Sequence, residues 1–252
     1  STPSSVAPGG VAFDGLGQGS TTVSAQIPGF TQLDNATRVV QVEPAALSLV
    51  GIPTSVGSGL RSPLLRARLN GSAHGGTTVE VTSLSPSIGG VAQASGDTAT
   101  ASIQVFVPDG SIDATFYLDG LEGATGQVIL SATATGFDGA SDLVDVVVPS
   151  IEILGVSPSQ DTLDPVDPFY ARVGVSNNGT SLNALQPLRP GSPELIVTFA
   201  VDDSTVALLE TPGARGPQVT LTIGEGESST PTSQVAGGVV LDGIAAGSVT
   251  VS

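Results

Sequence analysis

Cysteine, methionine, tryptophan and lysine are all absent from this chain of 252 residues, and only one histidine is present. The absence of cysteine excludes disulfides and thiolate chemistry, and the absence of lysine excludes Lys–Asn isopeptide cross-links. Basic residues are scarce, because seven arginines stand against 23 acidic residues and leave a formal net charge of −16. Nucleic acids and anionic membrane surfaces need Lys or Arg to neutralise their phosphates, so neither is expected as a partner.

Long apolar runs are also lacking. A membrane-spanning helix needs about 18 or more consecutive apolar residues, so no membrane insertion is expected in this segment. No signal peptide or cell-wall sorting motif is visible in it either. Hydrophobic residues nevertheless make up 39% of the chain and charged residues only 12%, a balance that excludes an intrinsically disordered protein.

Apolar and polar residues alternate in several short runs, at residues 65–69, 128–134, 197–201 and 219–223. Period two with many Val and Thr residues is typical of strands that bury one face. Turn sequences such as Asp119-Gly120 and Asn177-Asn178-Gly179 separate the runs, and no helical stripe occurs. The sequence therefore predicts an all-β fold built from β-sandwiches.

An internal repeat links the two ends of the sequence. Residues 1–24 and residues 229–252 align without a gap at an offset of 228 residues and are identical at 14 of 24 positions. A shorter and looser period lies inside it, since Asp14-Gly15-Leu16 recurs as Asp119-Gly120-Leu121 and as Asp242-Gly243-Ile244. Self-similarity at a fixed period is the signature of repeat architectures. We therefore expect a two-domain unit of 228 residues, repeated along a longer protein.

The domain boundaries follow from this period. We interpret residues 1–44 as the closing strands of an incomplete domain, residues 45–149 as a complete domain, and residues 150–252 as a domain that lacks its last strand. The closing strands are predicted at residues 38–42 and 143–148. A single proline lies in each short link between domains and limits bending there, so an extended array is expected.

The middle domain resembles a known family. Its sequence VEVTSLSPSIGGVA, followed by ASIQVFVPDG and by DGLEGATGQVILSA, is similar to the tandem bacterial Ig-like repeat domains of large surface and extracellular fibre or adhesin proteins. The second domain departs from this pattern at residues 203–206, at residues 224–226 and in a Pro-rich insertion at residues 184–193. The resemblance implies an immunoglobulin-like β-sandwich, extracellular exposure and a stalk, fibre or adhesion role. It implies no catalytic or ligand-binding residue.

Candidate catalytic residues are few. His74 is the single histidine, and a Ser/His/Asp triad would have to use it. It lies in a Gly-rich loop without a nucleophile motif, so a solvent-facing loop histidine is the simpler interpretation. No pair of carboxylates lies in a run with aromatic residues, as a glycosidase site would favour. The chain is therefore not expected to be an enzyme.

Acidic residues raise the question of calcium. Six aspartates lie near the predicted boundary between the second and third segments: Asp138, Asp142, Asp145, Asp161, Asp164 and Asp167. Calcium takes six to eight oxygen ligands, so an interdomain calcium ion is one interpretation. The other is that Asp-Pro sequences form solvated turns. Asp202 and Asp203 are open to the same two interpretations.

Three asparagines fit the N-glycosylation sequon, namely Asn35, Asn70 and Asn178. They are the candidate modification sites of the chain. Two aromatic pairs, Phe116-Tyr117 and Phe169-Tyr170, could each direct one ring outward toward a sugar or a partner. Strand alternation accounts equally well for one outward residue in each pair.

The function expected from these features is that of a structural module in an extracellular or cell-surface stalk, fibre or filament, with neighbouring repeats or copies of itself as partners. Two further hypotheses stay open: an adhesin segment that binds carbohydrate or protein, and an accessory domain of an enzyme. Consecutive units could be joined covalently. Alternatively, separate subunits could polymerise by β-strand complementation, with residues 38–42 completing a sheet edge near Ser252.

Overall fold

The structure is a computed structural model that describes residues 10–252 except residues 12, 14, 16–17 and 162–165. Regular structure in this part of the chain is β-strand apart from two single 3-10 turns, η1 (Asp34–Ala36) and η2 (Gln234–Ala236). None of the helices among these residues is long and apolar enough to cross a membrane. The predicted all-β fold of tandem β-sandwiches in an extended array is confirmed.

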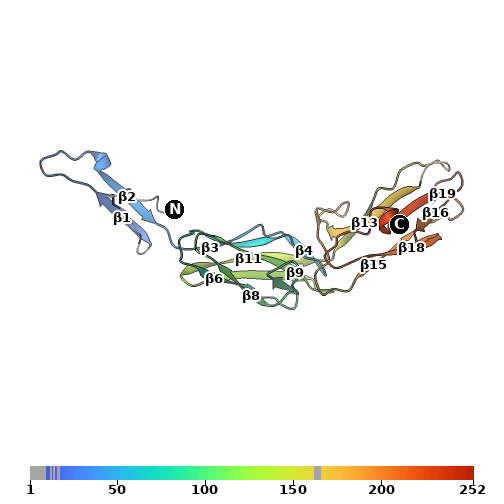
Figure 1. Cartoon of the computed structure of the whole chain (residues 1–252), viewed down its shortest axis with the longest axis horizontal. Coiled ribbons are helices and arrows are strands. Elements are labelled where there is room, and N and C mark those ends of the chain that lie inside the picture. Colours follow the sequence, from blue (N-terminus) through green and yellow to red (C-terminus); the bar gives the residue numbers. More distant parts are fainter. Residues whose placement is uncertain (1–9, 12, 14, 16–17, 162–165) are drawn as a thin grey trace.

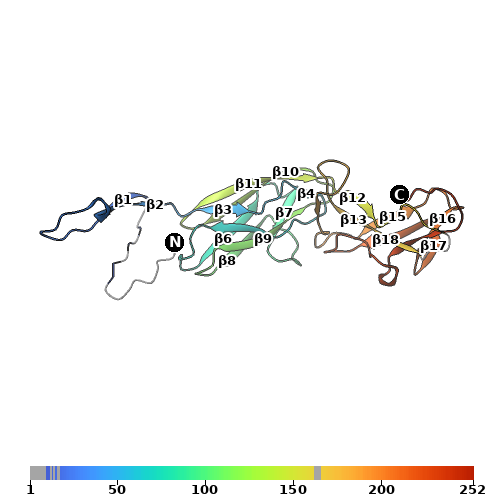
Figure 2. The same cartoon turned by 90° about the horizontal axis from the view of Figure 1, so that it is seen from above.

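A hairpin and two sandwiches follow one another along the molecule (Figure 1). The hairpin pairs β1 (Gly19–Ser24) with β2 (Thr37–Val42) and stands apart from both sandwiches. The view from above shows the same linear order (Figure 2). The long axis of the molecule is therefore set by end-to-end packing of separate units.

The first sandwich consists of a four-stranded and a five-stranded sheet. The four-stranded sheet has the order β3-β5-β9-β7, and the five-stranded sheet has the order β4-β11-β10-β6-β8. This division resembles the two sheets of immunoglobulin-like domains. The strands are β3 (Leu47–Val50), β4 (Ser55–Gly57), β5 (Leu65–Leu69), β6 (Thr77–Ser83), β7 (Gly89–Ala92), β8 (Ser102–Val107), β9 (Asp113–Gly120), β10 (Gly126–Ala134) and β11 (Phe137–Val147).

Strand alternation builds the first core. Leu65, Ala67 and Leu69 of β5 are buried, whereas the arginines between them are not. From the opposite sheet, Val128 and Leu130 of β10 reach the same cluster with no exposed surface. Burying an aliphatic side chain of this size contributes about 1.5–3 kcal/mol. The apolar side chains of the period-two pattern therefore hold the two sheets together.

The second sandwich is less symmetrical. A six-stranded sheet of order β12-β13-β19-β16-β17, with β14 on β13, faces the two-stranded sheet β15-β18. Phe169 and Phe199 meet edge-to-face between the two sheets, with ring centroids 5.3 Å apart. The strands are β12 (Ser150–Leu154), β13 (Asp167–Val175), β14 (Ala184–Leu185), β15 (Leu195–Ala200), β16 (Ala207–Thr211), β17 (Ala214–Gly216), β18 (Gln218–Ile223) and β19 (Val239–Gly243).

The expectation that Asp119-Gly120 forms a turn is wrong. Both residues end strand β9, where Asp119 is fully buried, and Gly120 lies against the backbone of Gly57. A Cβ atom at residue 120 would lie 2.4 Å from the carbonyl oxygen of Gly57. The glycine is therefore required by close approach of two backbones rather than by a turn. Asp242-Gly243 likewise ends strand β19.

Candidate functional site: the junction between the sandwiches and the edge of strand β15

A short backbone ladder joins the two sandwiches. Leu60 and Leu188 form an antiparallel bridge, flanked by hydrogen bonds from Arg61 N to the Pro187 carbonyl oxygen (2.9 Å) and from Arg189 N to the Gly59 carbonyl oxygen (3.1 Å). Leu188 is in turn fixed to its own sandwich, because its N–H donates to the Glu227 carbonyl oxygen at 2.8 Å. The two sandwiches are thus connected twice, by the covalent link after β11 and by this ladder.

Gln186 adds a buried polar contact to the ladder. Its side chain is 1% exposed, its Oε1 accepts a hydrogen bond from Gly57 N at 2.8 Å, and its Nε2 donates to the Ser55 carbonyl oxygen at 3.0 Å. Arg189 forms an ion pair with Glu122 nearby. Buried amide groups are stable only when their hydrogen bonds are made, so Gln186 fixes the position of one sandwich against the other.

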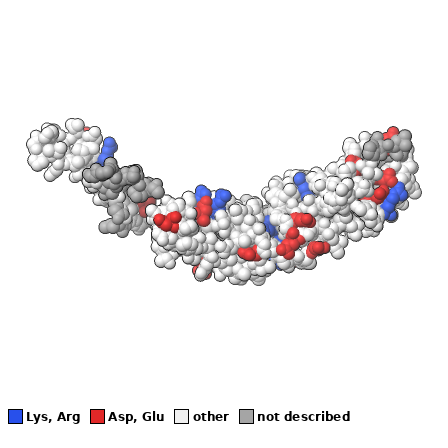
Figure 3. Space-filling view, viewed as in Figure 1, with Lys and Arg blue, Asp and Glu red and all other residues white. Residues whose placement is uncertain are grey.

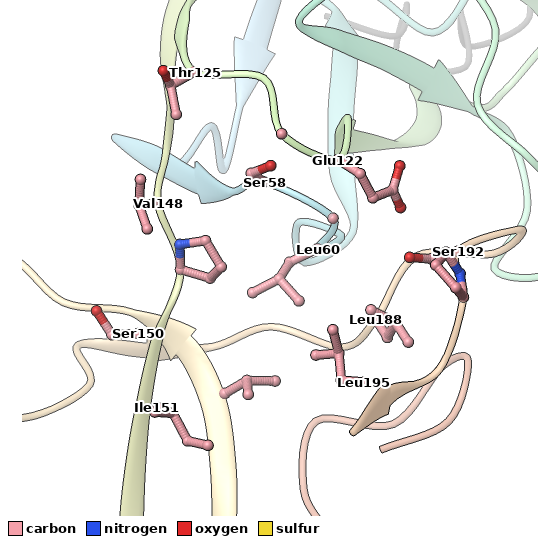
Figure 4. A pocket seen from close by; sticks show the side chains of 15 residues that line it. Ser58, Leu60, Glu122, Thr125, Val148, Ser150, Ile151, Leu188, Ser192 and Leu195 are labelled. Atoms are coloured by element: carbon pink, nitrogen blue, oxygen red, sulfur yellow. The ribbon is translucent and has the colours of Figure 1, made fainter. Parts of the chain in front are cut away.

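Leu60 belongs to the core of the neighbouring sandwich. The residue lies between β4 and β5 of the first sandwich, yet its side chain is 1% exposed and packs in the second core with Leu188. Figure 4 shows Leu60, Leu188 and Leu195 directed toward one another. Removing this side chain would therefore open the second core and the junction together.

An apolar pocket of about 360 Å³ lies beside these leucines. It is lined by residues of both sandwiches, with Val148 and Ile151 on the link side and Glu122 at the rim (Figure 4). Its volume falls within the range of small-molecule sites. The only acidic residue in the lining, Glu122, is paired with Arg189, so no unpaired carboxylate faces this pocket.

The ladder falls in the Pro-rich insertion at residues 184–193, where the sequence departs from the repeat pattern. Sequence reasoning missed the role of Leu60, Gln186 and Leu188, because none of them lies in an alternating run. The insertion itself was the one available signal. Gln186 precedes Pro187, and Leu188 and Arg189 lie between Pro187 and Pro190; such a segment can present side chains without joining a sheet.

The link before the first sandwich is fixed by Asn70. Its Nδ2 donates to the Pro44 carbonyl oxygen at 2.8 Å, and its Oδ1 accepts from Ala46 N at 3.0 Å. Ala46 also bridges to Asp138 of β11. The entry of the chain into the first sandwich is thus held by side-chain and backbone bonds in addition to the stiffness of Pro44.

Arg61 and Asp119 form a buried ion pair next to the junction. Arg61 is 3% exposed, and its Nε and Nη2 contact the two carboxylate oxygens of Asp119 at 2.6 and 2.8 Å. The guanidinium also donates to the carbonyl oxygens of residues 94, 95 and 97 and lies 5.0 Å from the ring centre of Tyr117. Burial raises the pKa of Asp119, and the bonds from Arg61 act against that rise. Every donor of the pair is directed into the protein, which makes it a structural rather than a substrate-binding feature.

His74 is half-buried, and both of its ring nitrogens form hydrogen bonds. Its Nδ1 accepts a hydrogen bond from Gly76 N at 3.1 Å, so its Nε2 carries the proton and donates to the Ser111 carbonyl oxygen at 2.9 Å. The ring also packs edge-on against Phe137. His74 is therefore fixed to the backbone of neighbouring loops, and no hydroxyl nucleophile is among these partners.

The aspartates of the calcium hypothesis that the structure describes form no metal-binding group. Asp138 and Asp145 lie seven positions apart on extended strand β11, which separates them by about 23 Å. Asp167 lies in the second sandwich and accepts a hydrogen bond from Ser157 N. Asp164 lies outside the described residues. Among the residues that the structure does describe, no three His, Asp or Glu side chains form a group able to hold a metal ion.

Asp202 and Asp203 act as local caps instead. Asp202 Oδ1 accepts from Thr250 N at 2.7 Å, and Asp203 Oδ1 accepts from both N and Oγ1 of Thr205. These hydrogen bonds hold the pKa of both carboxyl groups below the usual range.

The charged side chains visible in Figure 3 form small separate groups of both signs on a largely uncharged face.

The three sequon asparagines all lie on the surface. Asn35 is part of the turn η1 in the hairpin loop. Asn178 accepts hydrogen bonds from the N–H groups of Thr180 and Ser181 within its own loop. Asn70 already donates one amide hydrogen to the Pro44 carbonyl oxygen, so a glycan on Asn70 would have to share the atom that holds the link.

Of the aromatic pairs, Phe116 and Phe169 point into the cores with no exposed surface, while Tyr117 and Tyr170 are half-exposed. Tyr117 stacks on Arg61. Strand alternation thus explains both pairs.

The edge of strand β15 is the second notable feature. In the first sandwich β6 has β10 on one side and β8 on the other, whereas β15 pairs along its length with β18 alone. Among the described residues, the opposite side of β15 is met only at its end, where Ala200 and Ser252 exchange two hydrogen bonds of 2.9 Å and Val201 bridges to Val251. Most of this edge therefore carries free backbone donors and acceptors.

No protein-family model matches the sequence, and no curated protein matches it. Among solved structures, the chain is similar to a two-domain protein of unknown function from Bacteroides fragilis, with 9% sequence identity and a TM-score of 0.33. The similarity covers 79% of this chain and 83% of that one. A similarity at this level carries no argument about function, which has to be argued from the geometry and the internal repeat.

Proposed function

We propose that the chain is a structural repeat module of an extracellular stalk, fibre or filament and has no catalytic activity. The observation that carries this proposal is the doubly connected junction, in which the ladder between Leu60 and Leu188 and the buried side chain of Gln186 hold two sandwiches end to end. A spacer needs such a joint to hold its length.

The internal repeat supports the same proposal. A unit of 228 residues whose first 24 residues recur in similar form directly after it is suited to serial assembly. The net charge of −16 favours repulsion between parallel fibres and opposes their lateral aggregation. Extracellular location rests on the resemblance to tandem bacterial Ig-like repeats, and the expected partners are neighbouring repeats or copies of the chain.

Small-angle X-ray scattering tests this proposal. We expect the single chain to give the profile of a rod, with a maximum dimension close to that of the structure at low and high salt. A longer chain with two repeat units should roughly double that dimension. A compact particle, or a distribution of distances typical of sandwiches that move freely about a flexible link, would contradict a stalk role.

The junction pocket favours a second candidate function, an adhesin segment. The pocket of about 360 Å³ is apolar and accessible from the surface, so it could take an apolar portion of a carbohydrate or protein ligand. Chemical-shift mapping of the chain against a glycan panel tests this alternative. Shifts confined to Val148, Ile151 and Leu195 would support it, and no shift at millimolar ligand would exclude it.

A further inference from the structure

The β1–β2 hairpin has the same register as the β10–β11 hairpin inside the first sandwich. Gly19 faces Val42 and Ser24 faces Thr37, just as Gly126 faces Val146 and Ser131 faces Ser141. The first residue of each hairpin is a glycine with a positive φ, of 141° and 135° respectively. The two hairpins are therefore the same structural element in two places.

The two hairpins differ in what covers them. In β10–β11 the inward face is buried in the core, with exposures of at most 2%: Val128, Leu130, Ala132, Val144 and Val146. The matching residues of β1–β2 are exposed or half-exposed: Thr21, Val23, Ala25, Val40 and Val42. A free two-stranded hairpin is only marginally stable in water, and among the described residues no sheet covers the inward face of the β1–β2 hairpin.

The second sandwich offers the complementary gap. Strand β15 corresponds to β6, because Val197 and Phe199 match Val79 and Val81 at an offset of 118 residues and all four are buried. Strand β6 carries the β10–β11 hairpin, whereas β15 has most of that edge open among the described residues. A cavity of about 810 Å³ lies beside residues 245–251, the segment that meets the end of β15, and is lined in part by Val206, Leu241 and Val249.

We propose that the open edge of β15 in one copy of the chain binds the β1–β2 hairpin of a second copy, which completes the second sandwich. The register follows from β10 on β6, where Leu130 faces Ser83 and Thr133 faces Glu80. On β15, Val23 of the incoming hairpin faces Val201, and Gln26 faces Thr198. This inference names the partner contact within the proposed fibre and therefore rests on the proposed function.

The segment at residues 247–252 does not block this contact. Its sequence, Gly-Ser-Val-Thr-Val-Ser, differs from the Gly-Ser-Thr-Thr-Val-Ser of β1 at one position. The incoming β1 can therefore take over its bonds to Ala200 and Asp202 without loss. The hairpin then extends the pairing along β15 from Ala200 to Thr198 and inserts Val40 and Val42 into the cavity. This added pairing and burial opposes the entropy cost of association.

Engineered disulfides test the register directly, since the chain has no cysteine of its own. Two single-cysteine variants, Gln26→Cys and Thr198→Cys, are mixed in a glutathione redox buffer, and the cross-linked heterodimer is quantified on a non-reducing gel and identified by mass spectrometry. Directly opposed strand residues have Cα atoms about 4.5–5.5 Å apart, which a disulfide can bridge. We expect the heterodimer to accumulate.

Thr220→Cys is the matched control for Thr198→Cys. Thr220 is exposed and lies opposite Thr198 on β18, one strand further from the edge, and at about 10 Å it is beyond the reach of a disulfide. A tandem fusion, in which residues 25–252 follow Ser252 directly, is the positive control and should form the same disulfide within one chain. Equal cross-linking at residues 198 and 220, or none at residue 198 when the fusion does cross-link, would overturn the proposal.

A pair of hairpin variants separates docking from unspecific association. Val40→Asp places a carboxylate on the inward face and should lower the cross-linking yield at residue 198 by roughly tenfold or more, because an unpaired charge would be buried. Val39→Asp lies on the outward face, at the position that matches Leu143, and should leave the yield unchanged. Equal effects of both would contradict docking through the inward face. Small-angle scattering by each variant at low concentration shows whether the single chain is a rod or a compact particle. A missing cross-link with a rod-shaped chain would contradict only the contact between copies, whereas a compact particle would contradict the proposed stalk function.

Discussion

Arg61 places a charge inside the first sandwich and meets a carboxylate, three carbonyl oxygens and an aromatic ring there. A buried guanidinium stabilises the fold only when all of its partners are present. If Arg61 were removed, its partners would remain buried as polar groups without a hydrogen-bond partner. Asp242 is the residue of the second sandwich that corresponds to Asp119 in the repeat, and its partner there is the exposed Arg215. The repeat thus keeps the acidic residue and changes its burial.

We expect Arg61→Ala to lower the unfolding free energy of the first sandwich by about 3–5 kcal/mol, because Asp119 would remain buried without its partner. Urea denaturation followed by circular dichroism measures this change. Arg66→Ala is the control, since Arg66 is 3.9 Å from Asp113 and its side chain is 45% exposed; exposed pairs contribute about 0–1 kcal/mol. Equal losses in the two variants would contradict the buried pair.

Asp109 makes part of the stability depend on pH. Its Oδ1 accepts hydrogen bonds from the backbone N–H groups of Gly75 and His74, and these bonds hold the pKa of Asp109 below the usual range of aspartate. A carboxyl group with a lower pKa in the folded chain stabilises it above the unfolded pKa and loses this effect as the pH falls through the folded pKa. The stabilisation is therefore complete at neutral pH and is lost in acid, as the pH falls from the usual pKa of aspartate through the lower pKa of Asp109 in the folded chain.

We expect Asp109→Asn to be less stable than the natural chain at pH 7 and to approach it in stability as the pH falls below about 4. Thermal denaturation of both proteins between pH 7 and pH 2.5 measures the difference. A difference that stays constant over this range would mean that the charge of Asp109 does not strengthen the two hydrogen bonds.

At the scale of single strands, backbone contact decides which residues are tolerated. Gly120 ends β9 against the carbonyl group of Gly57, and Ser58 bridges to Gly120 in parallel. We expect Gly120→Ala to destabilise the first sandwich by about 1–3 kcal/mol, because the backbone of β4 has to move away from an added methyl group. Differential scanning calorimetry measures this loss.

Gly110→Ala is the comparison for Gly120→Ala, because it should destabilise the chain for a different physical reason. Nothing lies within 4 Å of a Cβ atom at residue 110, but its φ is +86°, so the substitution costs backbone strain rather than a clash. Only Gly120→Ala should weaken protection of the Gly59 and Leu60 amides in hydrogen exchange. Equal loss of protection in both variants would argue against the close approach at Gly120.

The strands were predictable from the sequence because their cause is local. Leu65, Ala67 and Leu69 alternate with arginines, and the structure buries the first set and leaves the arginines exposed or half-exposed. Asp119-Gly120 was assigned to a turn because Asp-Gly is common in turns, whereas its role here depends on Arg61 and Gly57, which lie far away in the sequence. The junction was not predictable for the same reason, since Leu60 and Leu188 meet only once both sandwiches exist.

At the scale of the whole molecule, the junction couples the stability of the two sandwiches to the shape of the rod. Leu60→Ala would leave a cavity in the second core and should lower its unfolding free energy by about 2–5 kcal/mol. The same variant should broaden the distance distribution in small-angle scattering, because the ladder to Leu188 loses its side-chain packing. Scattering and urea denaturation on one sample measure both effects.

Leu64→Ala is the control for the junction, because Leu64 is 43% exposed and belongs to neither core cluster. It should change the unfolding free energy by about 0.5 kcal/mol or less and leave the scattering profile unaltered. Loss of stability in Leu60→Ala without any change in scattering would show that the covalent link alone keeps the sandwiches in line.

The second connection at the junction also determines how the molecule responds to pulling. Tension along the long axis reaches the second sandwich through the peptide link at residues 147–150 and, in parallel, through the hydrogen bonds between residues 57–61 and 186–189. A single covalent link would let one sandwich swivel about the other under shear. With two attachments, torque is resisted until the Leu60–Leu188 strand contact separates, so the joint itself becomes the element that yields first and can re-form when the force is released.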